Sequence, residues 1–263
     1  MTKCWLRIMA VAAVGVLLNA CSHIDADERL LYVEPAAVQR SVLVEEFSGQ
    51  LCVNCPAGAE ELERIQQEYG SDAVIVVTIH GGELALTGDD EVVGLRSEQG
   101  DQLYQQWGSP DQPSAALDRR SQPLLRDKWQ GEVYKELQRA SALTLAVETS
   151  YEADSRQLKL SVEAQTAEDV NGTLHVWLTE DGIVAPQMFP ETIAMDYVHN
   201  HVFRMALGGI SGTPVAVKWG RDNRFDYEVT LPADWNPTQL SAVAFIVGAD
   251  GVEQVTRKKV IHS

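Results

Sequence analysis

The chain has 263 residues, which is enough for one large domain or two ordinary ones. Hydrophobic residues make up 45% and charged residues 22%, values typical of a globular protein that buries a core. The formal net charge of −17 argues against nucleic-acid binding and against electrostatic adhesion to anionic lipid. No nucleic-acid partner is therefore expected.

The N-terminal segment has the pattern of an export signal. Basic residues precede an apolar run, 8–18, that is too short for a comfortable membrane span. The following Leu-Asn-Ala-Cys ends at Cys21 and resembles a bacterial lipobox, in which the cysteine is acylated and becomes the first mature residue. We therefore expect a lipoprotein signal peptide over 1–20 and palmitate-type acyl chains on Cys21. The alternative is ordinary signal cleavage at the same place.

The residue after Cys21 bears on location. Ser22 stands there instead of aspartate, and in bacteria with the standard sorting pathway this resembles an outer-membrane-directed lipoprotein. Several acyl chains make a stable membrane anchor, whereas one is marginal. The expected location is the bacterial cell envelope, with the protein lipid-anchored in the outer membrane, on its periplasmic or its surface face. Residues 21–37 are polar and are expected to form a tether.

The first folded region, 38–140, begins with a β–α–β pattern. Residues 42–44 form a short apolar strand, and 56–69 carry apolar side chains at helical spacing. Residues 73–79 are a β-branched run, which is typical of a strand buried on both faces. We therefore expect two parallel strands joined by a right-handed crossover.

The rest of this region is less regular. Residues 80–100 are rich in glycine and acidic side chains and have no clear pattern. A short helix is predicted at 101–107, a turn leading into a short strand at 108–118, and a closing helix at 125–137.

From residue 141 onward, apolar and polar residues alternate, as in strands with one buried face. Turns are predicted at Asn171-Gly172 and Asp250-Gly251. Seven strands are expected, at 143–147, 158–162, 174–178, 201–207, 225–231, 242–247 and 252–261. Short strands without helices predict an immunoglobulin-like β-sandwich over 141–263. The expected fold class is therefore α/β plus all-β, in two successive domains.

Two cysteines, Cys52 and Cys55, lie between the first strand and the first helix. Unpaired N–H groups at a helix N-terminus favour a thiolate, which is the nucleophile of thiol–disulfide chemistry. Because Cys4 leaves with the signal and Cys21 carries lipid, these two can pair only with each other or with a partner. One Cys-x-x-Cys is weak evidence for a metal site. No metal or other cofactor is expected.

These residues resemble the thioredoxin superfamily. The Cys-x-x-Cys lies between an apolar strand and an amphipathic helix, Pro113 precedes a short strand, and Glu46 lies six residues before Cys52. The resemblance implies a thioredoxin-like domain over 38–140, with Cys52 the more exposed, attacking thiolate. Cys55 is then the resolving thiol that closes the intramolecular disulfide.

The same resemblance gives Glu46 and Pro113 catalytic roles. Glu46 would exchange a proton with Cys55, because an apolar setting raises the pKa of a carboxyl group. Pro113 would place backbone beside the sulfurs for pairing with a substrate peptide. The alternatives are a partly exposed strand-end glutamate and a plain turn proline. Two departures are Leu51 in place of the usual tryptophan and the dipeptide Val53-Asn54.

Most of the mature chain also resembles a narrower family, the lipoproteins named for an outer membrane protein of about twenty-eight kilodaltons. The resemblance lies in the segment 44–56, in Gln112-Pro113-Ser114 with Asp118-Arg119 after it, and in the segment 199–204. It implies location and fold more than activity.

The leading functional expectation is thiol–disulfide exchange, an oxidoreductase activity with extracytoplasmic protein thiols or disulfides as partners. The alternative is a surface binding or adhesion lipoprotein with a structural disulfide. A third interpretation is a metal site at His199, His201 and Asp196, because alternate residues of a strand share a face. Packing of these histidines against the other domain is favoured over metal binding. His80 follows a buried strand and is a candidate neighbour of the cysteines.

Overall fold

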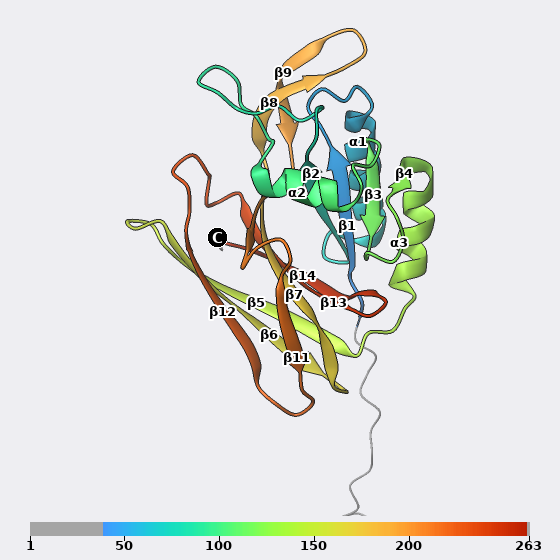
Figure 1. Ribbon diagram of the computed structural model, residues 1–263, viewed down its shortest axis with the longest axis vertical. Coiled ribbons are helices and arrows are strands. Elements are labelled where there is room, and N and C mark those ends of the chain that lie inside the picture. Colours follow the sequence, from blue (N-terminus) through green and yellow to red (C-terminus); the bar gives the residue numbers. More distant parts are fainter. Residues whose placement is uncertain (1–38, 262–263) are drawn as a thin grey trace, which may run out of the picture. The chain divides into compact units, whose positions relative to one another are not determined.

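The computed structural model describes residues 39–261, and the expected signal peptide, Cys21 and most of the tether lie outside these residues. Strands dominate the described part (Figure 1). They form a nine-stranded sheet, a three-stranded sheet and a two-stranded hairpin.

The fourteen strands in the described part of the chain are β1 Val42–Ser48, β2 Val74–His80, β3 Ser114–Leu117, β4 Leu124–Leu125, β5 Leu143–Glu152, β6 Gln157–Thr166, β7 Val170–Glu180, β8 Ile183–Met188, β9 Ile193–His199, β10 Val202–Leu207, β11 Thr213–Val217, β12 Asn223–Thr230, β13 Leu240–Gly248 and β14 Gly251–Lys259. The α-helices that the structure describes are α1 Cys55–Tyr69, α2 Glu98–Gln106 and α3 Trp129–Leu137, and a 3-10 turn at Arg126–Lys128 precedes α3.

The parallel pair predicted from the sequence is confirmed in β1 and β2, which α1 connects. Every residue of both strands is buried, because both of their faces are covered. On one face, Val42 and Val44 share a core with Leu62 of α1 and Trp129 of α3. α1 ends at Gly70, whose φ of 98° is a conformation that glycine adopts without a side-chain penalty.

The other face of β1 and β2 packs against strands far along the chain. Leu43, Ile75 and Val77 share a core with Trp177 of β7 and Phe245 of β13. The indole of Trp177 and the ring of Phe245 meet edge to face, with centroids 4.9 Å apart. This core therefore joins residues from both of the regions that the sequence pattern separates.

The predicted fold class is wrong. A separate α/β, thioredoxin-like domain followed by a β-sandwich is not what the structure has, because one sheet runs through both regions in the order β14-β13-β7-β10-β2-β1-β3-β4. At the junction, Val202 of β10 pairs with Thr78 of β2, whose N–H donates to the His201 carbonyl over 2.8 Å. All described residues fall in one compact unit.

The β-rich half is organised around β7, which pairs with β10, β13 and β11. Leu174, Val176 and Leu178 face the three-stranded sheet β12-β6-β5 across a large apolar core. The turn predicted at Asn171-Gly172 is wrong, because both residues lie within β7 and Gly172 pairs with Val215. The turn at Asp250 is confirmed by the hairpin of β13 and β14.

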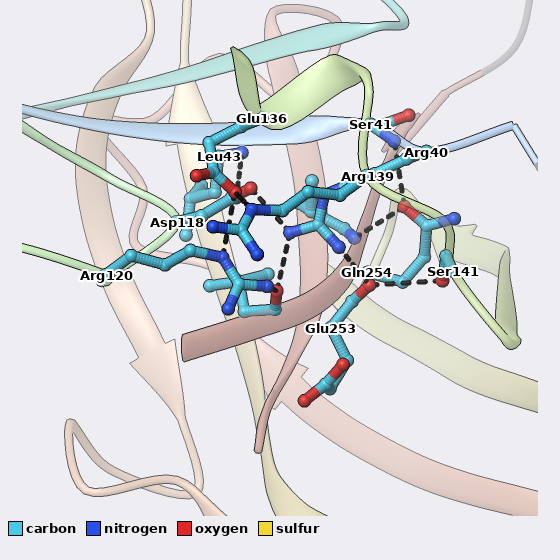
Figure 2. A network of polar contacts seen from close by, with 12 residues as sticks. Arg40, Ser41, Leu43, Asp118, Arg120, Glu136, Arg139, Ser141, Glu253 and Gln254 are labelled. Atoms are coloured by element: carbon cyan, nitrogen blue, oxygen red, sulfur yellow. Dashed lines mark hydrogen bonds and ion pairs between the residues drawn. The ribbon is translucent and has the colours of Figure 1, made fainter. Parts of the chain in front are cut away.

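A buried polar network ties the start of β1 to β14 (Figure 2). The Arg40 guanidinium donates to Asp118 over 2.6 Å and to the carbonyls of Val252 and Glu253 over 2.6 and 2.8 Å. Asp118 also accepts from the N–H of Leu43 over 2.8 Å. In the same network, Arg120 donates to Glu136 over 2.8 Å. These charges hold the two ends of the described chain together.

Candidate functional site

A cavity of about 490 Å³ lies over the C-terminal ends of β1 and β2, where parallel strands commonly place binding sites. Residues of α1 and of the β8–β9 hairpin form its walls. In Figure 1 this hairpin stands at one end of the molecule, next to the start of α1. The lining residues with side chains able to do chemistry include Glu46, Cys55, Thr78, His80, Tyr197 and His199.

Cys52 and Cys55 form a disulfide at the edge of this cavity. Cys52 is 4% exposed and Cys55 is 3% exposed, so the expected greater exposure of Cys52 is not observed. Gln187 of β8 donates to the Cys52 carbonyl over 2.9 Å, and the Met188 N–H donates to the Gln50 carbonyl over 2.7 Å. The hairpin is therefore hydrogen-bonded to the loop that carries the disulfide.

Glu46 projects from β1 toward the cavity and is 1% exposed, so it is not a partly exposed strand-end residue. Its Oε2 accepts from the Thr78 hydroxyl over 2.8 Å, whereas its Oε1 has no hydrogen-bond partner among the described residues. Burial raises the pKa of Glu46 to about 7, although the bond from Thr78 acts in the opposite direction. This carboxyl group therefore changes charge near neutral pH.

Pro113 and Glu46 meet at the first turns of α1. The Gln112–Pro113 peptide bond is cis. A Cβ on Gly58 would lie 3.0 Å from the Pro113 Cβ and 3.1 Å from Glu46 Oε1, so a side chain at this position would crowd both residues. The structure thus brings Cys55, Glu46 and Pro113 together around one end of α1.

Two histidines line the same cavity, His80 at the end of β2 and His199 at the end of β9. Their ring centroids are 5.5 Å apart, with the planes at 75°. Burial lowers the pKa of His80 to about 3, and His199 and Arg204 act in the same direction. Burial also lowers the pKa of His199 to about 4, although hydrogen bonds to the Pro186 and Ala185 carbonyls act to raise it. Both rings are therefore neutral at pH 7.

The residues of the metal interpretation do not come together. His201 lies beyond the end of β9 and contacts Asp181, with Nδ1 3.1 Å from the carboxylate, while Asp196 is exposed on the hairpin. The backbone of His201 has a φ of 57°, so the strand alternation that would align it with His199 has ended. Within residues 39–261, no group of three His, Cys, Asp or Glu side chains could hold a metal ion.

The β8–β9 hairpin was missed from the sequence, and with it the cavity residues Gln187 and Tyr197. Its first strand contains Pro186, which argues against a central strand, and its apolar residues do not alternate strictly. The candidate role of His80 was recognisable because it directly follows a buried strand. The sequence pattern paired His199 with His201, but the neighbour of His199 in the cavity is His80.

The fold and the cavity define the chain as a β-rich protein with a disulfide-flanked pocket. A profile of the family described as outer membrane protein Omp28 matches residues 100–263, which is more than half of the chain. The chain therefore belongs to the Omp28 family, and its predicted location in the outer membrane of the bacterial cell envelope is confirmed. The matched range does not include Glu46 or the cysteines. Within the described residues, helices long and apolar enough to cross a membrane are absent.

Two solved structures from one bacterium are similar to parts of this chain. HBP35 of Porphyromonas gingivalis superposes with a TM-score of 0.68 and 13% identity, over 85% of this chain and 76% of that chain. This likeness shows a shared fold. A domain of the outer membrane lipoprotein Omp28 from Porphyromonas gingivalis has a TM-score of 0.33 and 19% identity, over 46% of this chain and 88% of that chain. Curated protein sequences contain no significant match. The thioredoxin-like resemblance gains no support from these comparisons.

Proposed function

We propose that this chain is a lipid-anchored binding protein of the outer membrane, in which the Cys52–Cys55 disulfide is structural. Burial of the disulfide carries the proposal, because the two cysteines are only 4% and 3% exposed. Exchange requires a thiolate to reach a disulfide sulfur, and the surrounding chain restricts that approach. Cys21 is the acylated residue in this proposal and holds the protein at the membrane.

The cavity and the adjoining hairpin supply the binding surface. A volume of about 490 Å³ lies within the range of about 300–1,000 Å³ that is typical of ligand pockets. Beside it, the hairpin exposes Val184, Ile193, Met195 and Val198, each at least half accessible to solvent. Clustered exposed apolar side chains are common at protein interaction sites. The disulfide fixes the loop on which the hairpin is seated.

Glu46 favours a second candidate, thiol–disulfide exchange. A partner thiolate would attack the Cys52 sulfur, and the Cys52–Cys55 bond would break. The Cys55 thiolate would then take a proton from the Glu46 carboxyl group, which burial keeps partly protonated near pH 7. A second thiol of the partner would release the mixed disulfide, so that the partner is oxidised and the cysteine pair is reduced.

The reduction potential of the cysteine pair separates the two candidates. The full chain in detergent is equilibrated with glutathione buffers, and free thiols are alkylated and counted by mass. We expect a potential below about −300 mV, which is typical of structural disulfides. The rate of mixed-disulfide formation at Cys52 is measured in the same samples and is expected to be slow.

A potential between about −120 and −270 mV, the range of exchange enzymes, would contradict the structural role and support oxidoreductase activity. Glu46→Gln then tests the proton step. If Cys55 takes its proton from Glu46, this variant slows reduction and removes its dependence on pH near 7, whereas Glu61→Gln on the same helix leaves both unchanged.

A further inference from the structure

The cavity holds buried polar atoms without partners, and these atoms are mainly hydrogen-bond acceptors. Glu46 Oε1, both ring nitrogens of His80 and His199 Nε2 have no hydrogen-bond partner among the described residues. Because His199 is neutral and its other nitrogen serves the backbone carbonyls, Nε2 presents a lone pair. A neutral His80 ring adds one more acceptor and one donor. Buried unpaired groups are costly, so they indicate a missing partner.

The unpaired charged side chains around the cavity are acidic. Glu60 and Glu63 of α1 lie on its rim and form no ion pair with any described residue, and Glu46 lies inside. Burial raises the pKa of the Tyr197 phenol, and the three carboxyl groups of Glu46, Glu60 and Glu63 raise it further. The negative charges of these three carboxyl groups therefore all lie near Tyr197, on the side of the cavity that β9 forms.

Cations near the cavity are already paired. Asp181 lies at its edge, where Lys259 contacts it over 2.7 Å and His201 over 3.1 Å. Arg204 is close enough to affect His80, but it pairs with Glu180 over 3.2 Å. The lining residues that the structure describes include no lysine or arginine. A ligand that completes this site must bring hydrogen-bond donors and positive charge.

We infer that the cavity binds an organic cation, an ammonium or guanidinium group, carried by a small free amine or by a lysine or arginine side chain of a partner protein. This inference rests on the proposed binding function. An ammonium group offers three donors and a guanidinium five, which suits the acceptors of Glu46, His80 and His199. The cavity volume of about 490 Å³ exceeds that of the charged group alone and leaves room for its aliphatic chain.

Isothermal titration calorimetry on the full chain in detergent micelles tests the inference with two probes. Agmatine represents a free small cation, and N-acetyl-glycyl-arginyl-glycine amide represents a protein side chain. We expect at least one to bind at pH 8 and to bind about tenfold more weakly at pH 6. A carboxyl group with a pKa of about 7 falls from about nine-tenths to about one-tenth ionised over that range.

Glu46→Gln keeps the shape of the side chain and removes its charge. We expect it to weaken binding at least tenfold at pH 8 and to abolish the pH dependence. Glu61→Gln is the matched control, because Glu61 lies on the same helix but pairs with Arg64 over 2.6 Å and does not line the cavity. The double variant Glu60→Gln/Glu63→Gln changes only exposed rim positions and should weaken binding severalfold without disturbing the core.

The identity of the bound probe distinguishes a free amine from a partner side chain. Equal binding of pentylurea, a neutral analogue, would overturn the inference but leave the cavity as a binding site. Equal effects of Glu46→Gln and Glu61→Gln would also overturn it, as would the failure of both cationic probes to bind. The proposed function fails on a different measurement, the reduction potential and exchange rate of the cysteine pair.

Discussion

The strand β1 carries a polar cluster at each end, and the two clusters differ in how completely their charges are paired. At its start, Arg40 forms an ion pair with Asp118, and Arg120 forms one with Glu136. Backbone carbonyls accept further hydrogen bonds from the arginines (Figure 2). At its end, Glu46 and two neutral histidines leave acceptors unpaired around a cavity. The first arrangement stabilises the fold, whereas the second lowers stability and is useful only if something binds there.

Breaking the paired cluster should have the largest effect. Arg40→Ala leaves Asp118 buried without its cation, and burial already raises the pKa of Asp118 to about 6. We expect a loss of about 3–5 kcal/mol in the free energy of unfolding, measured by urea denaturation. Arg64→Ala is the control, because its ion pairs are exposed to solvent and contribute little to stability. Equal losses in the two variants would contradict the structural role of the Arg40 cluster.

The stability that Glu46 of the unpaired cluster contributes should fall as pH rises, whereas the stability from an ordinary paired carboxylate falls as pH is lowered. The pKa of Glu46 is 4.5 unfolded and about 7 folded, so the folded protein retains a proton that the unfolded chain has lost. Stability from this group is present below pH 4.5 and is lost as pH rises through 7. Glu46→Gln should therefore gain about 2–3 kcal/mol in the free energy of unfolding relative to the wild type between pH 5 and pH 8.

The comparison uses urea midpoints of both proteins at each pH, so that shifts from other groups cancel. Glu61→Gln should show a constant difference from the wild type across the same range. A constant difference for Glu46→Gln would mean that Glu46 does not titrate near neutral pH.

The disulfide lies beside the unpaired cluster and should contribute moderately. Cys52 and Cys55 are three positions apart, and closing so short a loop restricts the unfolded chain by about 2 kcal/mol on the chain-entropy estimate. The double variant Cys52→Ala/Cys55→Ala should lose about this amount by thermal or urea unfolding. Hydrogen exchange at the Met188 amide, which bonds to the Gln50 carbonyl, should also become faster. An unchanged stability would argue against a structural disulfide.

The smallest expected effect concerns His80. Its pKa falls from 6.5 to about 3 on folding, so the unfolded chain takes up a proton as pH falls below 6.5 and stability is lost. Between pH 7 and pH 5.5 the wild type should lose about 1 kcal/mol of its free energy of unfolding in this way, and His80→Gln should not lose it. Parallel pH profiles of the two proteins in urea unfolding would show that His80 is not held neutral.

Local patterns allowed much of the fold to be predicted. The helix α1 and the strands β1 and β2 follow from apolar spacing between residues 42 and 80, and β13 and β14 follow from alternation around a turn. The joined sheet could not be predicted. Burial of both faces of β2 explains its apolar composition, and that composition does not show which strand pairs at its edge. Asn171-Gly172 has the composition of a turn, but tertiary pairing with β11 holds it in a strand.

The candidate site was predictable only in part. Cys52, Cys55 and Glu46 are close in sequence, so their grouping follows from one strand, one loop and one helix. The hairpin that closes the cavity lies more than a hundred residues away and has weak strand signals. The position of His199 opposite His80 depends on that hairpin, and spacing within the segment 199–204 instead suggested a partnership with His201.

The bonds from Arg40 to residues 252 and 253 also constrain the order of folding. These contacts span up to 213 positions, so the first strand finds its partners among residues that are synthesised much later. Proteins dominated by contacts between distant residues fold slowly, because long loops must close before the contacts form. Until residue 254 is available, β1 lacks both Gln254, which binds the Ser41 N–H, and the carbonyls that receive Arg40. The chain just before β1 should therefore be among the last parts of the fold to become ordered, even though β1 itself pairs with the nearby β2.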